Sequence, residues 1–305
     1  EEVLIGAIME HLEEAGIHSG DSTCFIPPQN ISEGVLSKVE EWTTTIGLEL
    51  GIRGCYNIQF AIRDEELYVL EVNPRGSRTF PFVAKATGVP LARIAARVAL
   101  GEKLSSLDIP KPQTEAVSVK APVFPFIKLR GLDPAPGPEM KSTGEVMGSH
   151  ARPAAAYLKA RMATELPVPT SGGVYITVKD EDKSGTIELA KRLQDMGFKI
   201  HATPGTASAL REIGSLEVET CYRIEERKSP DALDLMRRGM IQLVINTPTA
   251  TGGAILDGNM MRRLAVELNI PFVTTMAGAK MEVEAIAEMQ LGTPEPRLLD
   301  ISTLD

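Results

Sequence analysis

Cysteine, histidine and aromatic residues are scarce in this sequence. Its 305 residues include three cysteines, four histidines and one tryptophan, and aromatic residues make up 5% of the chain. An odd number of cysteines, at positions 24, 55 and 221, provides neither a disulfide framework nor a metal-binding pair. The composition therefore argues against a disulfide-stabilised secreted protein. It favours a reducing compartment, either the cytoplasm or an organelle matrix, and we expect the cytoplasm.

A basic surface and a long apolar run are also missing. The net charge of -9 argues against nucleic acid or an anionic membrane as a partner. No apolar run reaches the roughly 18 residues that a membrane-spanning helix needs. The opening "EEVLIGAIME" is too acidic for a signal peptide. Because the chain starts without Met and within an apparent strand, we expect a piece of a longer protein.

The distribution of proline and of periodic segments predicts three regions: 1–104, a connector at 105–167, and 168–305. The first contains predicted strands at 3–9, 55–63 and 67–75 and helices at 31–50, 80–87 and 90–100. The connector is rich in proline, although "AVSVKAPVFPF" has strand character and "ARPAAAYLKARMAT" predicts a short helix. From 172 onward, strands and helices alternate at the spacing of βαβ units. This pattern predicts an α/β fold with a doubly wound parallel sheet.

Polar residues gather on one face of a predicted hairpin around "LYVLEVNPRGSR". If residues 64–66 form the loop, Gln59 faces Glu71 and Asn57 faces Asn73, so all four side chains share a face. The opposite face would pack on a core through Ile58, Phe60, Ile62, Tyr68, Leu70 and Val72.

One carboxylate and three amides provide the hard oxygen ligands that suit Mg²⁺. Arg75 and Arg78 follow, and arginine is suited to bidentate contacts with phosphate. The spacing predicts a metal and phosphate site, but a solvated hairpin face with surface arginines explains it equally well.

The segment "NIQFAIRDEELYVLEVNPRGSRTFPFVAKATGVPLARIAARVALG" strongly resembles the second synthetase half of the carbamoyl-phosphate synthase large subunit. The segment "GPEMKSTGEVMG" is equally typical of that family. The resemblance implies the last part of an ATP-grasp domain, an α+β fold with an antiparallel sheet. It implies that Gln59, Glu71 and Asn73 hold Mg²⁺ or Mn²⁺ on the phosphates of ATP and that Asn73 and Arg75 are catalytic. It also places His18 and Ser19, in "HSGDS", at the ATP and metal site, with K⁺ as a further candidate cofactor.

In this family the second half phosphorylates carbamate to carbamoyl phosphate, in pyrimidine or arginine synthesis. The implied partners are the rest of the large subunit, a glutaminase subunit or domain that supplies ammonia, and further copies in an oligomer. The family's phosphate clamp, lid and adenine-binding segment lie upstream of the matched region. We therefore expect residues 1–305 alone to be inactive.

The resemblance also bears on activation by ornithine. Positions matching Glu13 and Asp21 help to bind this activator in bacterial members of the family. A third acidic residue of the family falls on Ala121, which puts ornithine activation in doubt here.

Residues 168–305 resemble the methylglyoxal-synthase-like regulatory domain that ends the large subunit. "HATPGTAS" follows a predicted strand and opens a helix, where a phosphate can meet backbone N–H groups. The resemblance implies a phosphorylated effector such as UMP or IMP. Two positions depart from the family pattern, since Arg223 and Pro248 stand where a lysine and a threonine are usual. The implied effector contacts are Lys183, Thr203, Thr206, Arg223, Asn246 and Thr247.

Other interpretations stay open. A plain βα turn with a threonine N-cap also explains "HATPGTAS". The chain could be a binding module only. A methylglyoxal-synthase-like lyase would need a carboxylate base near the phosphate loop, and "TPTATGGA" at 247–254 has none. A biotin-dependent carboxylase also uses ATP-grasp chemistry, but its hairpin continues differently and nothing here resembles a biotin carrier.

Overall fold

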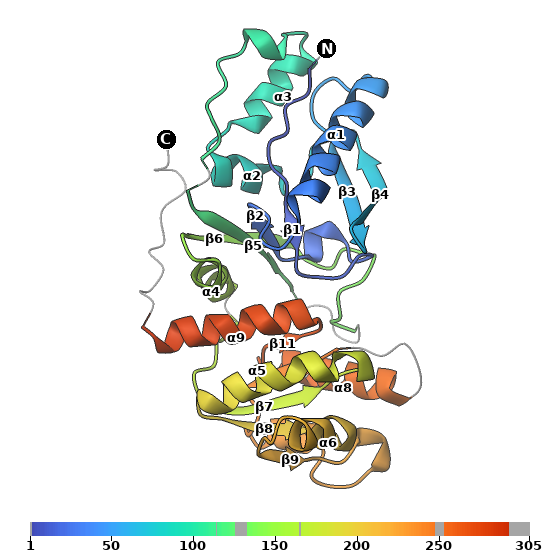
Figure 1. Ribbon diagram of the computed structural model, residues 1–305, viewed down its shortest axis with the longest axis vertical. Coiled ribbons are helices and arrows are strands. Elements are labelled where there is room, and N and C mark those ends of the chain that lie inside the picture. The colour runs from blue at the N-terminus through green and yellow to red at the C-terminus, as the bar shows by residue number, and fades with distance from the viewer. Residues whose placement is uncertain (1, 114, 126–132, 165, 248–252, 293–305) are drawn as a thin grey trace.

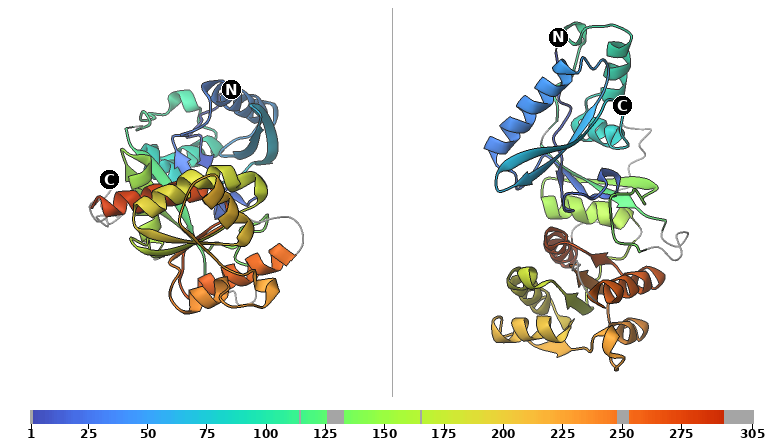
Figure 2. Two further views of the ribbon diagram at one scale, coloured as in Figure 1. Left: turned by 60° about the horizontal axis from the view of Figure 1, so that its bottom comes forward. Right: turned by 90° about the vertical axis from the view of Figure 1, so that its right-hand side faces the viewer.

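The structure is a computed structural model, and it describes residues 2–113, 115–125, 133–164, 166–247 and 253–292. A hairpin and a four-stranded antiparallel sheet lie in its N-terminal half, and a five-stranded parallel sheet lies in its C-terminal half (Figure 1). Two helices, α4 (Pro153–Ala163) and α9 (Met276–Gln290), pack on each other between these halves (Figure 2). In the described ranges, no helix combines the length and the apolar character needed to cross a membrane.

The antiparallel sheet combines strands from two distant parts of the chain. Its order is β1 (Glu10–His11), β2 (Cys24–Ile26), β5 (Val117–Val123) and β6 (Gly144–His150). Strands β5 and β6 come from the predicted connector, and β5 pairs directly with β2. The boundaries at 104/105 and 167/168 stay predictions, but the connector contributes half the strands of this sheet.

The predicted helices of the N-terminal half are confirmed to within two residues. They are α1 (Glu33–Glu49), α2 (Phe80–Thr87) and α3 (Leu91–Ala99), and short 3₁₀ turns lie at η1 (Ser19–Asp21) and η2 (Leu104–Ser106). Helix α1 begins at a serine cap, since the Ser32 hydroxyl accepts a hydrogen bond from Val35 N. It ends before Gly51, whose positive φ of 58° favours glycine.

The predicted strand at 3–9 is wrong. No strand is assigned to residues 3–9, although their apolar side chains are used. Ala7 and Met9 pack against the cluster around Ile26, whereas Ile8 packs against the cluster around Val35. The apolar alternation thus reflects packing on two sides rather than backbone pairing.

Strand β6 was not predicted, because its sequence GEVMGSH has two glycines and a low intrinsic preference for strands. Gly148 is required by close packing. A Cβ atom there would lie 2.3 Å from the Ala156 carbonyl oxygen and 2.4 Å from Ala160 N, both in α4. Tertiary packing against α4 therefore determines this strand more than local sequence does.

The parallel sheet has the predicted alternating pattern. Its order is β11 (Phe272–Val273), β10 (Leu243–Asn246), β7 (Gly172–Thr177), β8 (Phe198–Ala202) and β9 (Val218–Thr220), with every pair parallel. The connecting helices are α5 (Lys183–Asp195), α6 (Pro204–Glu212), α7 (Ala232–Arg237) and α8 (Gly253–Glu267), and the 3₁₀ turns are η3 (Asp180–Asp182) and η4 (Ile224–Glu226).

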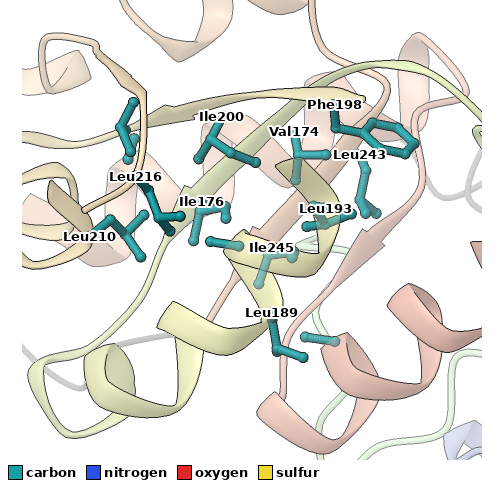
Figure 3. Close-up of a cluster of buried hydrophobic side chains, with 14 of the residues drawn as sticks. Val174, Ile176, Leu189, Leu193, Phe198, Ile200, Leu210, Leu216, Leu243 and Ile245 are labelled. Atoms are coloured by element: carbon teal, nitrogen blue, oxygen red, sulfur yellow. The ribbon is translucent and has the colours of Figure 1, made fainter. Parts of the chain in front are cut away.

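Both faces of this sheet are covered. Val174 and Ile176 of β7 pack against α5, α6 and α9 (Figure 3), whereas Tyr175 packs against α7 and α8 on the other face. This confirms a doubly wound sheet. The chain runs outward from β7 through β8 to β9 and then returns to β10 on the other side of β7. Such a switch leaves a crevice at the carboxyl ends of β7 and β10, where open α/β sheets bind ligands.

Candidate functional site

The hairpin of β3 (Asn57–Arg63) and β4 (Glu66–Asn73) carries the predicted polar face. Gln59 pairs with Glu71 and Asn57 pairs with Asn73, as predicted. Directly opposed residues of antiparallel strands share a face, so the four side chains lie together.

The turn and the strand pairing that produce this register differ from the prediction. The loop is the two-residue turn Asp64–Glu65, both with positive φ (53° and 63°), and Glu66 already pairs with Arg63. A β-bulge then adds one residue to β4: Phe60 pairs with Val69 and Gln59 with Glu71, which leaves Leu70 unpaired. The predicted three-residue loop was wrong, but the bulge compensates for it before the site.

The bulge also corrects the predicted apolar face. Between the turn and the bulge, Tyr68 pairs with Ala61 and is exposed. The unpaired Leu70 is also exposed. Leu67 is buried instead and packs with Val35 and Val39 of α1.

The polar face offers oxygen ligands held by hydrogen bonds. Asn73 Nδ2 donates to Glu71 Oε1 at 2.9 Å and to Asn57 Oδ1 at 3.3 Å, and Gln59 Nε2 donates to the Ile17 carbonyl at 3.4 Å. No cluster of three or more His, Cys, Asp or Glu side chains that could hold a metal occurs in the described ranges. One carboxylate with neighbouring amides nevertheless fits Mg²⁺ or Mn²⁺, since such ions take few protein ligands when phosphate completes their shell.

The two arginines after the hairpin differ in their contacts. Arg75 is exposed and donates to the neighbouring Gly76 carbonyl. Arg78 instead donates from Nη1 to the carbonyl oxygen and the hydroxyl of Ser142, at 3.0 and 2.8 Å. Arg75 therefore bonds within its own loop, whereas Arg78 holds the segment that contains Ser142.

The segment that contains Ser142 is bonded to the loop that contains Asp21, so the motifs "GPEMKSTG" and "HSGDS" lie together in space. Asp21 is 1% exposed, and its two carboxylate oxygens accept hydrogen bonds from Lys141 N and Ser142 N at 2.8 and 2.9 Å. His18 N donates to the Gly137 carbonyl at 2.9 Å. Asp21 thus anchors one motif to the other beside the hairpin.

His18 and Ser19 lie in this loop but make structural contacts. His18 Nδ1 accepts a hydrogen bond from Gly20 N at 3.0 Å and caps η1. The Ser19 carbonyl accepts from the fully buried Lys120 ammonium at 2.9 Å, and Glu145 lies 3.5 Å from the same Nζ. Sequence reasoning missed Lys120, although a lysine inside the apolar strand "AVSVKAPV" was a visible signal.

Glu13 and Ala121 lie near the same loop. Burial raises the pKa of the Glu13 carboxyl to about 7, even though Thr23 N donates to it at 2.6 Å. Ala121 is 2% exposed and packs in the apolar cluster with Leu12 and Phe25. A carboxylate at this position would be buried in that cluster, so the alanine suits the packing of this chain.

A second site lies at the crevice of the parallel sheet. All six predicted effector contacts line one cavity of about 240 Å³. Thr203 is the N-cap of α6 and Thr206 lies in its first turn. Asn246 ends β10 and Thr247 follows it. Lys183 begins α5, and Arg223 precedes η4. The departure at Pro248 lies outside the described residues.

The turn into α6 is suited to an anion. Thr203 is the N-cap residue, but its side chain makes no capping hydrogen bond and instead approaches Thr177 Oγ1 and Thr206 Oγ1, each at 3.4 Å. The side-chain cap of the alternative interpretation is therefore absent, and first-turn N–H groups are left for solvent or a ligand. Lys183 Nζ lies close to this turn, 3.3 Å from where a Cβ of Gly205 would be.

Acidic residues also line this cavity. Asp180 pairs with Lys183 at 2.6 Å, and Asp257, whose pKa is raised by burial, accepts from Glu225 N at 3.4 Å. Two aspartates therefore stand near the phosphate loop, although the segment 247–254 contains no carboxylate. Sequence spacing gave no signal for them.

Two family models match the chain. Residues 2–107 match the carbamoyl-phosphate synthase L chain, ATP binding domain, and residues 185–274 match the MGS-like domain. The carbamoyl phosphate synthase large chain of Methanothermobacter thermautotrophicus is 46% identical over 303 residues, covering 98% of this chain and 28% of that protein. The protein of the same name from Methanosarcina barkeri is 46% identical over 294 residues, covering 95% of this chain and 73% of that protein.

A third relative is described as the C-terminal section of this large chain, from Methanocaldococcus jannaschii. It is 45% identical over 303 residues, and the match covers 96% of this chain and 49% of that protein. Several relatives are much longer, and this chain spans 28% of the length of the first of them. The matches cover both halves of the structure. The chain therefore belongs to the carbamoyl-phosphate synthase large-chain family.

Proposed function

We propose that this chain provides the metal-binding hairpin of a carbamate-phosphorylating site together with an effector-binding domain. The pairing of Gln59 with Glu71 and of Asn57 with Asn73 carries the first part, because it gathers oxygen ligands on one face beside Arg75. Gln59, Glu71 and Asn73 would hold Mg²⁺ or Mn²⁺. A bound cation of this kind neutralises phosphate charge during transfer of the γ-phosphoryl group.

The protein groups have separate tasks in this proposal. Asn73 orients the Glu71 carboxylate through its hydrogen bond, and Gln59 ties the hairpin to the loop at 17–22. The Arg75 guanidinium supplies positive charge for the transferring group, which is the type of contact that arginine makes best. The proposal also includes ATP as the phosphoryl donor, a glutaminase partner as the source of ammonia, and a cytoplasmic location.

The proposal predicts that residues 1–305 alone do not turn over ATP. In-line phosphoryl transfer requires complete positioning of both substrates, and the family's phosphate clamp and lid are expected elsewhere. Purified chain with Mg²⁺, ATP, bicarbonate and ammonia should release phosphate at the background rate. Turnover that follows the protein through further purification would contradict this expectation.

The second part of the proposal is that the crevice of the parallel sheet binds a phosphorylated effector, with UMP as the first candidate. Three features support it: uncapped N–H groups at the start of α6, the ammonium of Lys183 beside them, and the hydroxyls of Thr203 and Thr206. Each is a known way to bind phosphate.

Removing one of these groups should weaken UMP binding. Lys183→Ala and Thr206→Ala should each cost about 1.5–3 kcal/mol, or roughly ten- to a hundredfold in affinity. Calorimetric titration with UMP, IMP and phosphoribosyl pyrophosphate measures this directly. Thr206 is buried, so Thr206→Ser serves as a companion that keeps the hydroxyl and should keep most of the affinity.

Lys191→Ala and Ser208→Ala are matched controls, because both residues are exposed on the same two helices and neither lines the cavity. They should bind UMP like the unmodified chain. If none of the three ligands binds below millimolar concentration, the assignment of an effector site is wrong.

A further inference from the structure

A single buried arginine contacts both a residue of the effector cavity and the segment that is anchored to Asp21. Arg262 of α8 is 4% exposed. Its Nη1 donates to Asn246 Oδ1 at 2.7 Å. A guanidinium can only donate, so it fixes the amide of Asn246 with Nδ2 on the other side, 3.4 Å from the Thr177 carbonyl. The cavity is therefore offered an amide donor, which suits a phosphate or carbonyl oxygen of a ligand.

The same guanidinium forms a bidentate ion pair with an aspartate of the N-terminal half. Arg262 Nε and Nη2 donate to the two carboxylate oxygens of Asp133, at 3.0 and 2.7 Å. Burial alone would raise the pKa of the Asp133 carboxyl, but the hydrogen bonds from Arg262 lower it below its ordinary value. Gly258 leaves room for this arrangement, since a Cβ there would lie 2.8 Å from Arg262 Nη1. The guanidinium is planar and rigid, so a shift of its contact with Asn246 also shifts its contact with Asp133.

Asp133 begins a segment that Lys141 closes. Lys141 Nζ donates to the carbonyl oxygens of Asp133 and Ala135, at 2.9 and 2.5 Å. The backbone of the same lysine donates to Asp21, and the next residue, Ser142, accepts two hydrogen bonds from Arg78.

The connection therefore runs from the cavity to the hairpin through direct contacts. Arg78 is three residues from Arg75, and the loop that contains Asp21 receives the hydrogen bond of Gln59 through its Ile17 carbonyl. Displacement of Asp133 would reach both the loop and the segment after the hairpin.

A second ion pair crosses between the halves without touching the cavity. Arg152 donates to both oxygens of Glu288, at 2.9 and 2.7 Å, between the start of α4 and the end of α9. It has the same bidentate geometry, and it is a natural control for any effect of merely joining the halves.

We propose that Arg262 is a positioning residue that transmits occupation of the effector cavity to Asp133 and, through residues 133–142, to the Asp21 loop. The proposal rests on the proposed effector site. A ligand oxygen that accepts from Asn246 Nδ2 competes with the Thr177 carbonyl, so it turns the amide and changes its contact with Arg262. Communication of this kind requires a physical element that both sites influence, and the Arg262–Asp133 pair is that element.

Hydrogen–deuterium exchange of this chain, with and without saturating UMP, tests the proposal. In the unmodified chain, UMP should change the exchange of peptides covering 133–142 and 18–23 by at least about twofold, in addition to peptides of the cavity. Asp133→Asn should bind UMP within about threefold of the normal affinity, because Asp133 does not line the cavity. It should nevertheless lose the remote change in exchange.

Two further variants make the result specific. Arg262→Lys keeps the charge but not the fork, and it should also lose the remote change. Arg152→Lys should retain it, since its ion pair lies away from the cavity. Circular dichroism and thermal melting identify any variant that fails to fold. If Asp133→Asn does not fold, Arg262→Lys provides the test, and if Arg262→Lys does not fold, Asp133→Asn provides it.

The outcomes separate the two proposals. If calorimetry detects no binding of UMP, IMP or phosphoribosyl pyrophosphate to the unmodified chain, the effector site is overturned and this inference falls with it. If UMP binds but changes exchange only at the cavity, this inference alone is overturned. It is also overturned if Asp133→Asn and Arg262→Lys keep the full remote change.

Discussion

A complete large chain carrying Glu71→Ala should form no detectable carbamoyl phosphate. Glu71 is the only carboxylate among the four hairpin side chains that share the polar face, so its loss removes the negative charge that would hold a cation. Losses of about a thousandfold or more are expected when a charged group that organises phosphoryl transfer is removed. The same variant should lose the reverse partial reaction, synthesis of ATP from carbamoyl phosphate and ADP.

Bicarbonate-dependent ATP hydrolysis is the internal control, because the resemblance assigns that step to the other synthetase half. It should persist in the Glu71→Ala enzyme. Glu66→Ala, at the opposite end of the same strand, should leave both partial reactions unchanged. Normal ATP synthesis by Glu71→Ala would show that the hairpin face is a solvated surface and not a metal site.

The second large effect concerns stability at the contact between α4 and α9. Glu282 is fully buried, and its carboxylate accepts hydrogen bonds from Tyr157 Oη at 2.8 Å and from Arg161 Nε and Nη2 at 3.0 and 3.2 Å. Burial and the nearby Glu282 carboxylate raise the pKa of Tyr157 well above its ordinary value, so the phenol stays a donor. Glu282→Gln leaves the Arg161 charge buried without a counterion, which should lower the free energy of unfolding by about 3–5 kcal/mol.

Urea unfolding followed by circular dichroism measures this loss. Glu288→Gln, in the partly exposed pair with Arg152, should cost only about 0–1 kcal/mol and is the matched control. Replacing both Glu282 and Arg161 with leucine and methionine should recover much of the loss, because no charge is then left buried. Equal effects of Glu282→Gln and Glu288→Gln would contradict the importance of burial.

The C-terminal half was largely predictable because its signals are local. Buried strands such as "LVIN" alternate with helices, and Gly197 and Gly239 follow α5 and α7. The N-terminal half was less predictable, because its antiparallel sheet joins residues near 25 to residues near 120. Strand β6 depends on packing against α4, which no local pattern reveals.

The candidate sites divide in the same way. Residues that follow one another on a hairpin or a βα turn, such as Gln59 with Glu71 or Thr203 with Thr206, could be assigned from spacing and resemblance. Contacts between distant segments could not be predicted in this way. Arg262 and Asp133, for example, are 129 residues apart in the chain. Asp21 was noted only by resemblance, and its role in binding Lys141 N and Ser142 N emerges only from the tertiary structure.

The bulge at Leu70 has a consequence for the comparison of related chains. For a fixed number of residues between Gln59 and Glu71, turn length and bulge together determine which residues face each other at the base of the hairpin, so a longer turn must be offset by loss of the bulge. A homologue with one more residue in the turn is expected to lack the bulge, and an alignment that ignores this would place gaps wrongly on both sides of Tyr68. Deleting Leu70 alone should instead leave a regular ladder in which Glu71 follows Val69 and still faces Gln59, because the deletion removes only the residue that has no partner.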